Sequence, residues 1–393
     1  MLLVVLIHSA LAYTRLDIPG LLWGVRQPSG HIGFDVFAWW SMGVSMPLFF
    51  ALSGFLAAQV ESARGPRAYL LGRSRRIVVP MIVLGPILLV LCFCAWALGW
   101  LATGRCRWGE ISRMVYLDPA IERELYGPAH LWFLEYLTPM LLVFGVFRLI
   151  RPSRRNCDPG RPPTLPWWAP LALAIPTAGL LAVARALGMG DLPLDRHNSF
   201  APDPVRVLHY AAFFGFGIAL VRARGSLGAL GRRSGPTLLA AGLASLARVG
   251  LLPLDWSGRG GAWVGPALIA STALAAWLTL FGLIGLARQY LARPSRAVGF
   301  VAEASFWVYL VHLPLVGLIQ ADLVPLAWPT EAKFAATAAL TLALGLGSYP
   351  VLVRRTFLGW ILGARRSATK RSGSAGPAPR LIADQPAKVN SPA

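Results

Sequence analysis

Long apolar runs separated by short basic segments make up most of this chain. The run from Phe34 to Val60 exceeds about 20 residues, the length that an α-helix needs to cross a bilayer. The basic segment at 61–76 that follows is predicted to be a tight loop, and a second apolar run begins at Ile77. The pattern predicts an all-α, polytopic membrane protein of about ten transmembrane helices. We place them at residues 1–13, 34–60, 77–101, 129–150, 167–188, 205–222, 236–253, 263–287, 298–323 and 333–353.

The first of these segments is short. MLLVVLIHSALAY would span about 20 Å as a helix at 1.5 Å per residue, against a hydrocarbon core of about 30 Å. It lacks the basic start of a signal peptide. We therefore expect Met1 to lie within the first helix, either because the true start is upstream or because this copy is truncated.

Composition supports the membrane interpretation and sets an orientation. The chain has 393 residues, of which 56% are hydrophobic and 14% charged, with a formal net charge of +20. If the 61–76 segment is cytoplasmic and the sides alternate, the inner segments hold 25 of the 37 Lys and Arg residues and three of the 17 acids. This bias predicts a multi-pass protein of the plasma membrane with both termini in the cytoplasm. The basic residues form short clusters between spans rather than one basic domain, which argues against nucleic-acid binding.

The ends and the cysteines add two expectations. Residues 364–393 are rich in Ser, Pro, Ala and charge, which predicts a disordered basic cytoplasmic tail after a membrane domain at 1–363. The four cysteines have neither metal-site nor disulfide spacing. We interpret them as small buried residues and predict no metal site.

His8 is the first candidate for chemistry. An imidazole on an apolar helix is costly in a membrane unless it is neutral, partnered or facing water. Histidine can take and return a proton near neutral pH, which suits a general base. The alternative is a neutral histidine that bonds a neighbouring helix.

Arg73 and Arg76 are the second candidate. They are three residues apart and would share one face of a helix at the inner membrane surface. Two guanidinium groups there could bind the phosphates of a cytoplasmic, nucleotide-type cofactor. The alternative is a basic anchor that only fixes topology.

The segment AHLWFLEYL, residues 129–137, carries three polar or amphipathic groups at a span end. We interpret His130 and Trp132 as anchors at the outer interface. Glu135 lies just inside the span, where a carboxylate usually faces a polar pathway or a partner.

A late segment, VGFVAEASFWVYLVHLPL at 298–315, has several polar groups in an apolar helix. Ser305, Tyr309 and His312 follow i, i+4, i+7 spacing and form one stripe, while Glu303 falls on another sector. Such a stripe should face the bundle interior and could line a pathway. The alternative is interhelical hydrogen bonding that only holds helices together.

Taken in order, these segments resemble the acyltransferase 3 family of integral membrane acyltransferases. The resemblance rests on LVVLIHSA, MPLFFALSGFLAA, the RSRR…P segment, HLWFLEYL, SFWVYLVHLPL and SYPVLVRRTFLGWILG, and covers about residues 1–363. The motifs MPLFFALSGF and HLWFL are most similar to those of the branch that includes the glucan biosynthesis succinyltransferase.

The resemblance implies an O-acyltransferase that moves an acetyl or succinyl group from cytoplasmic acyl-CoA to a hydroxyl of a glucan, surface polysaccharide or other glycoside. It implies that His8 is the essential histidine, that Arg73 and Arg76 bind acyl-CoA, and that Glu303 matches a polar position of the late span. Acyl-CoA would be a donor substrate, and no cofactor would be permanently bound. The partners would be acyl-CoA, a carbohydrate acceptor and the bilayer.

One departure stands beside this resemblance. The family usually has an arginine eleven residues before the histidine, a position that would precede Met1 here. A transporter or flippase of a glycan or small molecule, without covalent chemistry, is the competing prediction, because ten spans with intramembrane polar groups fit it too. A membrane sensor or scaffold is a third, suggested only by the tail.

Overall fold

The computed structural model describes residues 1–16, 21–27, 29–116, 127–151, 165–189, 199–223, 232–290 and 295–362. Within these ranges the chain forms helices and loops and no β-strand. In the same ranges, eight helices are long and apolar enough to cross a membrane, and two shorter apolar helices accompany them, Leu2–Tyr13 and Pro204–Leu220. The prediction of an all-α, polytopic membrane protein is confirmed. The tail at 364–393 lies outside the described residues.

Each predicted span contains one helix or one continuous helical run. Short 3-10 or π-helical pieces, labelled η, extend several of the helices. The elements are α1 (Leu2–Ala10), η1 (Leu11–Tyr13), α2 (Ile32–Arg64), α3 (Pro66–Arg73), η2 (Ser74–Val78), α4 (Val79–Ala102), α5 (Trp108–Arg113), η3 (Ala129–Leu131), α7 (Trp132–Ile150), α8 (Ala169–Ala186), α9 (Pro204–Leu220), α11 (Ser234–Trp256), α12 (Val264–Tyr290), α13 (Arg296–Leu323), α14 (Thr330–Ser348), η5 (Tyr349–Val353) and α15 (Phe357–Ile361).

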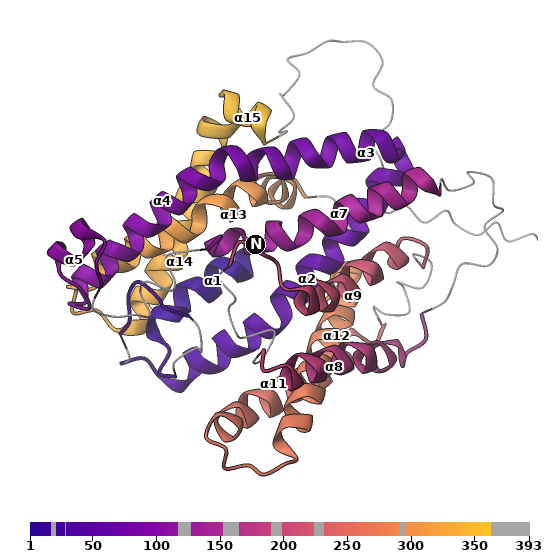
Figure 1. The fold of residues 1–393 in the computed structure, drawn as a ribbon, viewed down its shortest axis with the longest axis horizontal. Coiled ribbons are helices and arrows are strands. Elements are labelled where there is room, and N and C mark those ends of the chain that lie inside the picture. The colour runs from indigo at the N-terminus through magenta and orange to yellow at the C-terminus, as the bar shows by residue number, and fades with distance from the viewer. Residues whose placement is uncertain are drawn as a thin grey trace, which may run out of the picture.

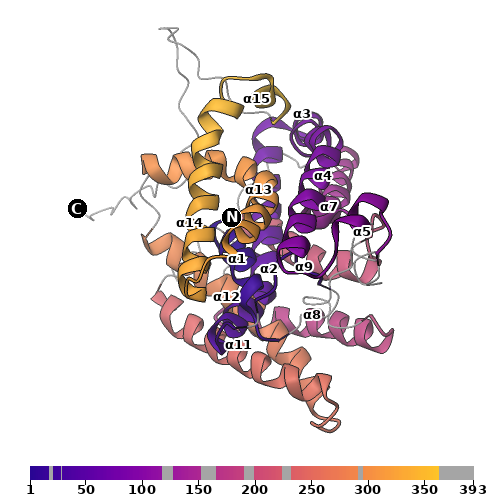
Figure 2. The same cartoon turned by 90° about the vertical axis from the view of Figure 1, so that its left-hand side faces the viewer.

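Helix α2 runs through the middle of the bundle (Figure 1, Figure 2). It packs against α9, α12, α11 and α1, which makes it the helix around which the others are placed. Its closest partner is α9, and glycines permit this approach. A Cβ on Gly217 would lie 1.9 Å from the Ala51 carbonyl oxygen, and one on Gly54 would lie 2.0 Å from the Phe214 carbonyl oxygen. The two backbones therefore touch at this crossing, as small residues allow in membrane helices.

The basic segment at 61–76 is not the loop that the sequence predicts. Helix α2 continues to Arg64, and α3 begins at Pro66, so only Gly65 separates them. Gly65 has φ of 81°, in the region that favours glycine, and Pro66 suits the first position of a helix. From Pro66 the chain stays helical through η2 and α4 to Ala102. The basic residues thus lie on a helix that continues into the membrane.

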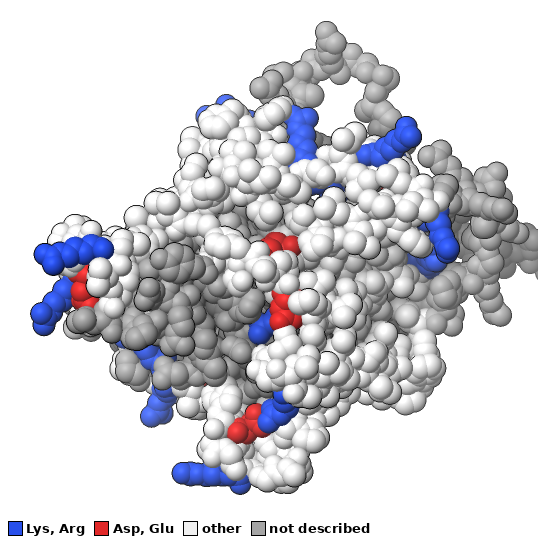
Figure 3. All heavy atoms as spheres, viewed as in Figure 1, with Lys and Arg blue, Asp and Glu red and all other residues white. Residues whose placement is uncertain are grey.

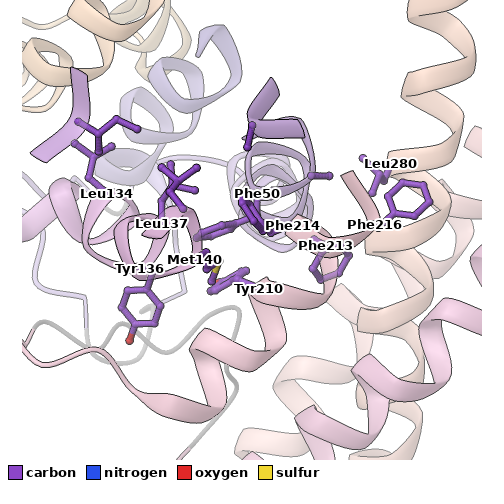
Figure 4. Close-up of a cluster of buried hydrophobic side chains, with 14 of the residues drawn as sticks. Phe50, Leu134, Tyr136, Leu137, Met140, Tyr210, Phe213, Phe214, Phe216 and Leu280 are labelled. Carbon is purple, nitrogen blue, oxygen red and sulfur yellow. The ribbon is translucent and has the colours of Figure 1, made fainter. Parts of the chain in front are cut away.

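An aromatic core joins the middle helices. Figure 4 shows side chains of α2, α7, α9 and α12 meeting in it. Phe50 stacks on Tyr210 with 4.6 Å between ring centroids, and Phe213 stacks on Trp277 at 4.4 Å. The Trp277 indole N–H donates to the Thr177 hydroxyl at 3.0 Å, so its polar atom is satisfied inside the core.

The outer surface fits a protein that faces lipid. Figure 3 shows a largely uncharged face, with a few charged side chains, mostly acidic, near its centre and most Lys and Arg side chains toward its margins, over α3 and around α5. Large apolar side chains are exposed along the spanning helices, among them Ile82, Ile87, Val90, Val143 and Ile175. A contiguous apolar belt of this kind is expected where a protein contacts hydrocarbon.

Candidate active site

Three histidines that are far apart in the sequence meet inside the bundle. His8 comes from α1, His130 from η3 and His312 from α13. The His8 Nδ1 and His312 Nε2 atoms are 2.9 Å apart, and these two ring centroids are 5.0 Å apart with planes at 28°. The rings of His130 and His312 lie at 88° to each other, with 5.3 Å between centroids. We call these three residues the histidine cluster.

Backbone carbonyls fix two of the three rings. The His312 Nδ1 atom lies 2.6 Å from the Tyr309 carbonyl oxygen, and the His130 Nε2 atom lies 2.9 Å from the Leu310 carbonyl oxygen. Pro314 makes the Leu310 carbonyl available, because proline has no N–H to donate to the residue four positions earlier in the helix. His130 supplies the hydrogen bond that the helix lacks at this position.

Tyr309 holds the backbone of η3 beside the cluster. Its hydroxyl donates to the His130 carbonyl oxygen at 2.6 Å, and its ring lies 5.6 Å from the His130 ring. The prediction that Tyr309 and His312 face the bundle interior therefore agrees with where the structure places them. Ser305, predicted on the same stripe, donates to the Ala302 carbonyl oxygen of its own helix.

The segment before α2 covers His8. The Trp23 indole lies parallel to the His8 ring, with planes at 8° and centroids 5.5 Å apart. Its N–H donates to Gln320 Oε1 at 2.7 Å, and the Gln320 amide donates to the carbonyls of His8 and Ser9 at 3.2 and 3.1 Å. Gln320 thus ties α13 to both α1 and the covering segment.

Asp35 anchors this segment from α2. Its side chain has no solvent exposure, and its carboxylate accepts hydrogen bonds from the backbone N–H groups of Arg15, at 3.0 Å, and Leu16, at 2.8 Å. Hydrogen bonds from backbone N–H groups offset the free-energy cost of burying a carboxylate, a cost that an unpartnered carboxylate would bear in full. Asp35 therefore holds the chain where it leaves the helical run of α1 and turns toward Trp23.

Replacing Asp35 with alanine should loosen this part of the molecule. The two N–H groups would lose a charged acceptor, and we expect the free energy of unfolding to fall by about 2 kcal/mol. Asp35→Asn keeps one oxygen acceptor and should cost less. Thermal denaturation of the purified variants in detergent measures the difference, and an alanine variant that melts with the parent would contradict this assignment.

The predicted acyl-CoA side carries its arginines on α3 and η2. Arg73 is half-buried, with its guanidinium 5.9 Å from the Tyr69 ring centroid, while Arg76 is exposed. Arg75 stacks on Trp360 of α15 at 4.4 Å. We call this end of the bundle, formed by α3, η2 and α15, the arginine-rich end. Because η2 is π-helical, the side chains of Arg73 and Arg76 are not set by regular α-helical spacing.

Glu303 lies away from the histidine cluster. Its carboxylate accepts hydrogen bonds from Tyr349 at 3.0 Å and from Arg354 at 2.5 Å. The hydrogen bond with Glu303 raises the pKa of Arg354 above its usual value, so the ion pair persists at every pH at which Glu303 is ionised. Glu303 thus joins α13 to the end of α14, at the arginine-rich end.

Glu135 lies between the histidine cluster and the arginine-rich end. It is on α7, five residues after His130, which is about 7.5 Å further along the helix axis toward the arginine-rich end. Both carboxylate oxygens are buried, and neither has a hydrogen-bond partner among the described residues. A buried acid of this kind is unusual in a structural role.

Sequence reasoning missed three residues in or beside the histidine cluster. It interpreted His130 as an interfacial anchor, whereas His130 is buried and belongs to the histidine cluster. Trp23 and Gln320 were not singled out, although a glutamine inside an apolar helix is itself a signal of a polar contact. Cys92, interpreted as a small buried residue, is buried and also has its Sγ 3.8 Å from His130 Nδ1.

The histidines do not form a metal site. No group of three His, Cys, Asp or Glu residues in the part of the chain that the structure describes could hold a metal ion. The nitrogen lone pairs do not converge, because His8 Nδ1 faces His312 Nε2 while the other anchored nitrogens face carbonyl oxygens. The arrangement is suited to passing protons instead.

The fold and the site define a class, a multi-pass membrane protein with a cluster of histidines inside its helical bundle. The model of the acyltransferase 3 family, described as an acyltransferase domain, matches residues 1–351. The chain therefore belongs to the acyltransferase 3 family and is a membrane acyltransferase, as the resemblance predicts. Searches of curated proteins and of solved structures found no match.

Proposed function

We propose that this protein is an O-acyltransferase that moves an acetyl or succinyl group from acyl-CoA to a hydroxyl of a glucan, surface polysaccharide or other glycoside. The observation that carries the proposal is the histidine cluster, in which His312 contacts both His8 and His130. One continuous helical run connects this cluster to the arginine-rich end. Family membership supports the transfer of an acyl group. The cluster supplies the general base that attack by a hydroxyl requires.

The positions of the charged groups support acyl-CoA as the donor. Acyl-CoA carries phosphates at one end and its thioester at the other. Arg73 and Arg76 lie at the arginine-rich end, and Cys92, which contacts the histidine cluster, lies 16 residues beyond Arg76 on the same helical run. That separation is about 24 Å along the helix axis. The phosphates would bind the guanidinium groups while the thioester reaches His8.

The reaction needs no covalent intermediate on the protein. His8 takes the proton of the acceptor hydroxyl as the oxygen attacks the thioester carbonyl. The carbon–sulfur bond then breaks, the ester remains on the acceptor, and the CoA thiolate receives the proton back from His8. Tyr309 and Glu135 would line the route between the arginines and His8.

The sidedness follows from the same arrangement. Acyl-CoA is a cytoplasmic metabolite, so the arginine-rich end would face the cytoplasm, as the charge bias predicts. The acceptor would enter from the opposite end, where Trp23 covers His8. We infer a plasma-membrane enzyme with both termini in the cytoplasm.

The test uses the full chain in proteoliposomes with acetyl-CoA or succinyl-CoA labelled in the acyl group, and a glucan acceptor. We expect label to move into an alkali-labile ester of the acceptor while an equal amount of CoA thiol is released. A transporter would leave the donor intact, and an intact donor with every acceptor tried would contradict the proposal.

The same assay tests the donor site. The double variant Arg73→Gln, Arg76→Gln should raise the KM for acyl-CoA about tenfold or more with kcat near the parent value, because charge-assisted phosphate contacts are lost. Arg113→Gln is the matched control, an exposed arginine on α5. An unchanged KM in the double variant would remove these residues from the donor site.

A further inference from the structure

We propose that His312 is a positioning residue that fixes the tautomer of His8 and stabilises protonated His8 by accepting a hydrogen bond from its Nδ1. The inference rests on the proposed acyl transfer and deepens it, because it names what makes His8 a base. It follows from three contacts: His312 with the Tyr309 carbonyl, His312 with His8, and the bracing of His8 by Gln320 and Trp23.

The first contact sets the tautomer of His312. Its Nδ1 lies 2.6 Å from the Tyr309 carbonyl oxygen, and a carbonyl oxygen only accepts. The Nδ1 atom therefore carries the hydrogen. His312 is wholly buried. Burial favours the neutral imidazole over the charged one, so its Nε2 has no hydrogen and presents a lone pair.

The second contact then sets the tautomer of His8. His8 Nδ1 and His312 Nε2 are 2.9 Å apart, which is a hydrogen-bond distance. Since His312 Nε2 accepts, His8 Nδ1 donates. The hydrogen of a neutral His8 is thus on Nδ1, and its Nε2 carries the lone pair that can take a proton. With these two nitrogens 2.9 Å apart, ring centroids that are 5.0 Å apart mean that the rings meet edge to edge.

The proton balance of the reaction follows. When His8 Nε2 takes the hydroxyl proton, His8 becomes a cation with a hydrogen on each nitrogen. His312 stays neutral, and its Nε2 lone pair accepts a hydrogen bond from the Nδ1–H of that cation and stabilises it. The His8 Nε2 atom then gives its proton to the CoA thiolate, which restores a neutral His8 with its hydrogen on Nδ1.

The bracing keeps this geometry in place before substrate binds. Gln320 holds the backbone of α1 at His8 and Ser9, and Trp23 lies flat against the His8 ring. With the main chain and one ring face fixed, His312 decides which nitrogen of His8 is basic. A base held this way needs no rearrangement at the moment of reaction.

The experiment compares His312→Gln with His312→Met in the full chain. Glutamine can present an oxygen acceptor near the position of Nε2, whereas methionine fills the volume without a comparable acceptor. We expect His312→Met to lower kcat about 100-fold and leave the KM for acyl-CoA unchanged, and His312→Gln to recover kcat to within about tenfold of the parent. The matched control is His31→Gln, an exposed histidine that pairs with Glu331.

A second readout is independent of turnover. Nitrogen-15 NMR of histidine-labelled protein, with the His8 signals assigned by their loss in His8→Gln, reports which ring nitrogen carries hydrogen. We expect hydrogen on His8 Nδ1 in the parent and a mixed tautomer in His312→Met. A parent His8 with hydrogen on Nε2, or a His312→Met variant with parental kcat, would overturn the proposal. Failure of the acyl-transfer assignment would show separately, as an inactive parent with the expected tautomer.

Discussion

A His8→Ala chain should lose acyl transfer by a factor of about 10²–10⁴, the range that a general base contributes. The hydroxyl would then have to attack the thioester without a base at the position of His8 Nε2, since the lone pair that His8 leaves unpaired, on His312 Nε2, belongs to a wholly buried ring. The measurement is release of CoA thiol and formation of acceptor ester in proteoliposomes with matched amounts of inserted protein.

The control for this variant is His31→Ala, which changes an exposed histidine that caps the start of α2. Insertion of both variants is checked by detergent extraction and size-exclusion chromatography. A His8→Ala protein that inserts normally and acylates the acceptor at the parent rate would remove His8 from the chemistry. The histidine cluster would then be a packing feature.

Gly217→Val should prevent stable assembly of the bundle. Even the first carbon of the new side chain would lie 1.9 Å from the Ala51 carbonyl oxygen, and that obstacle is backbone, which cannot rotate away. The α2–α9 crossing would have to open, and α2 also packs against α1, α3, α7, α11 and α12. We expect the free energy of unfolding to fall by more than about 3 kcal/mol, beyond ordinary overpacking. Thermal denaturation and the yield of monodisperse protein measure the effect.

Gly215→Val is the matched control, two residues away on the same helix. Nothing lies within 4 Å of a Cβ at Gly215, and this residue is exposed. The same substitution should therefore leave the melting temperature near that of the parent. Equal loss of stability in both variants would show that valine disturbs α9 itself and that the crossing is not responsible.

The sequence predicts the spanning helices well because length and hydropathy decide whether a segment can cross a bilayer. It fails at 61–76, where arginines suggest a loop. Tyr69, Leu70 and Leu71 are compatible with a helix, and α3 packs against α7 through Leu70 and Gly145. Tertiary packing of this kind has no signature in charge or hydropathy alone.

The site was predictable in part for a related reason. A polar residue in an apolar membrane helix needs a partner or a polar cavity. For that reason the sequence singles out His8, Tyr309 and His312. Their convergence with His130 depends on how α1, η3 and α13 pack, which periodicity does not specify. One local clue was available: Pro314 leaves the Leu310 carbonyl without its helical donor, so a partner from elsewhere in the chain was to be expected.

The edge-to-edge histidine pair has a consequence for energised membranes. The proton is gained and lost at the same atom, His8 Nε2, because His312 only accepts a hydrogen bond from Nδ1. Each transfer to or from Nε2 joins two heavy atoms about 3 Å apart. That is about a tenth of a core of about 30 Å, so a potential of about 100 mV would alter the energy of the step by only about 0.2 kcal/mol. The chemistry would be electrically almost silent, and collapsing the transmembrane voltage should leave its intrinsic rate nearly unchanged.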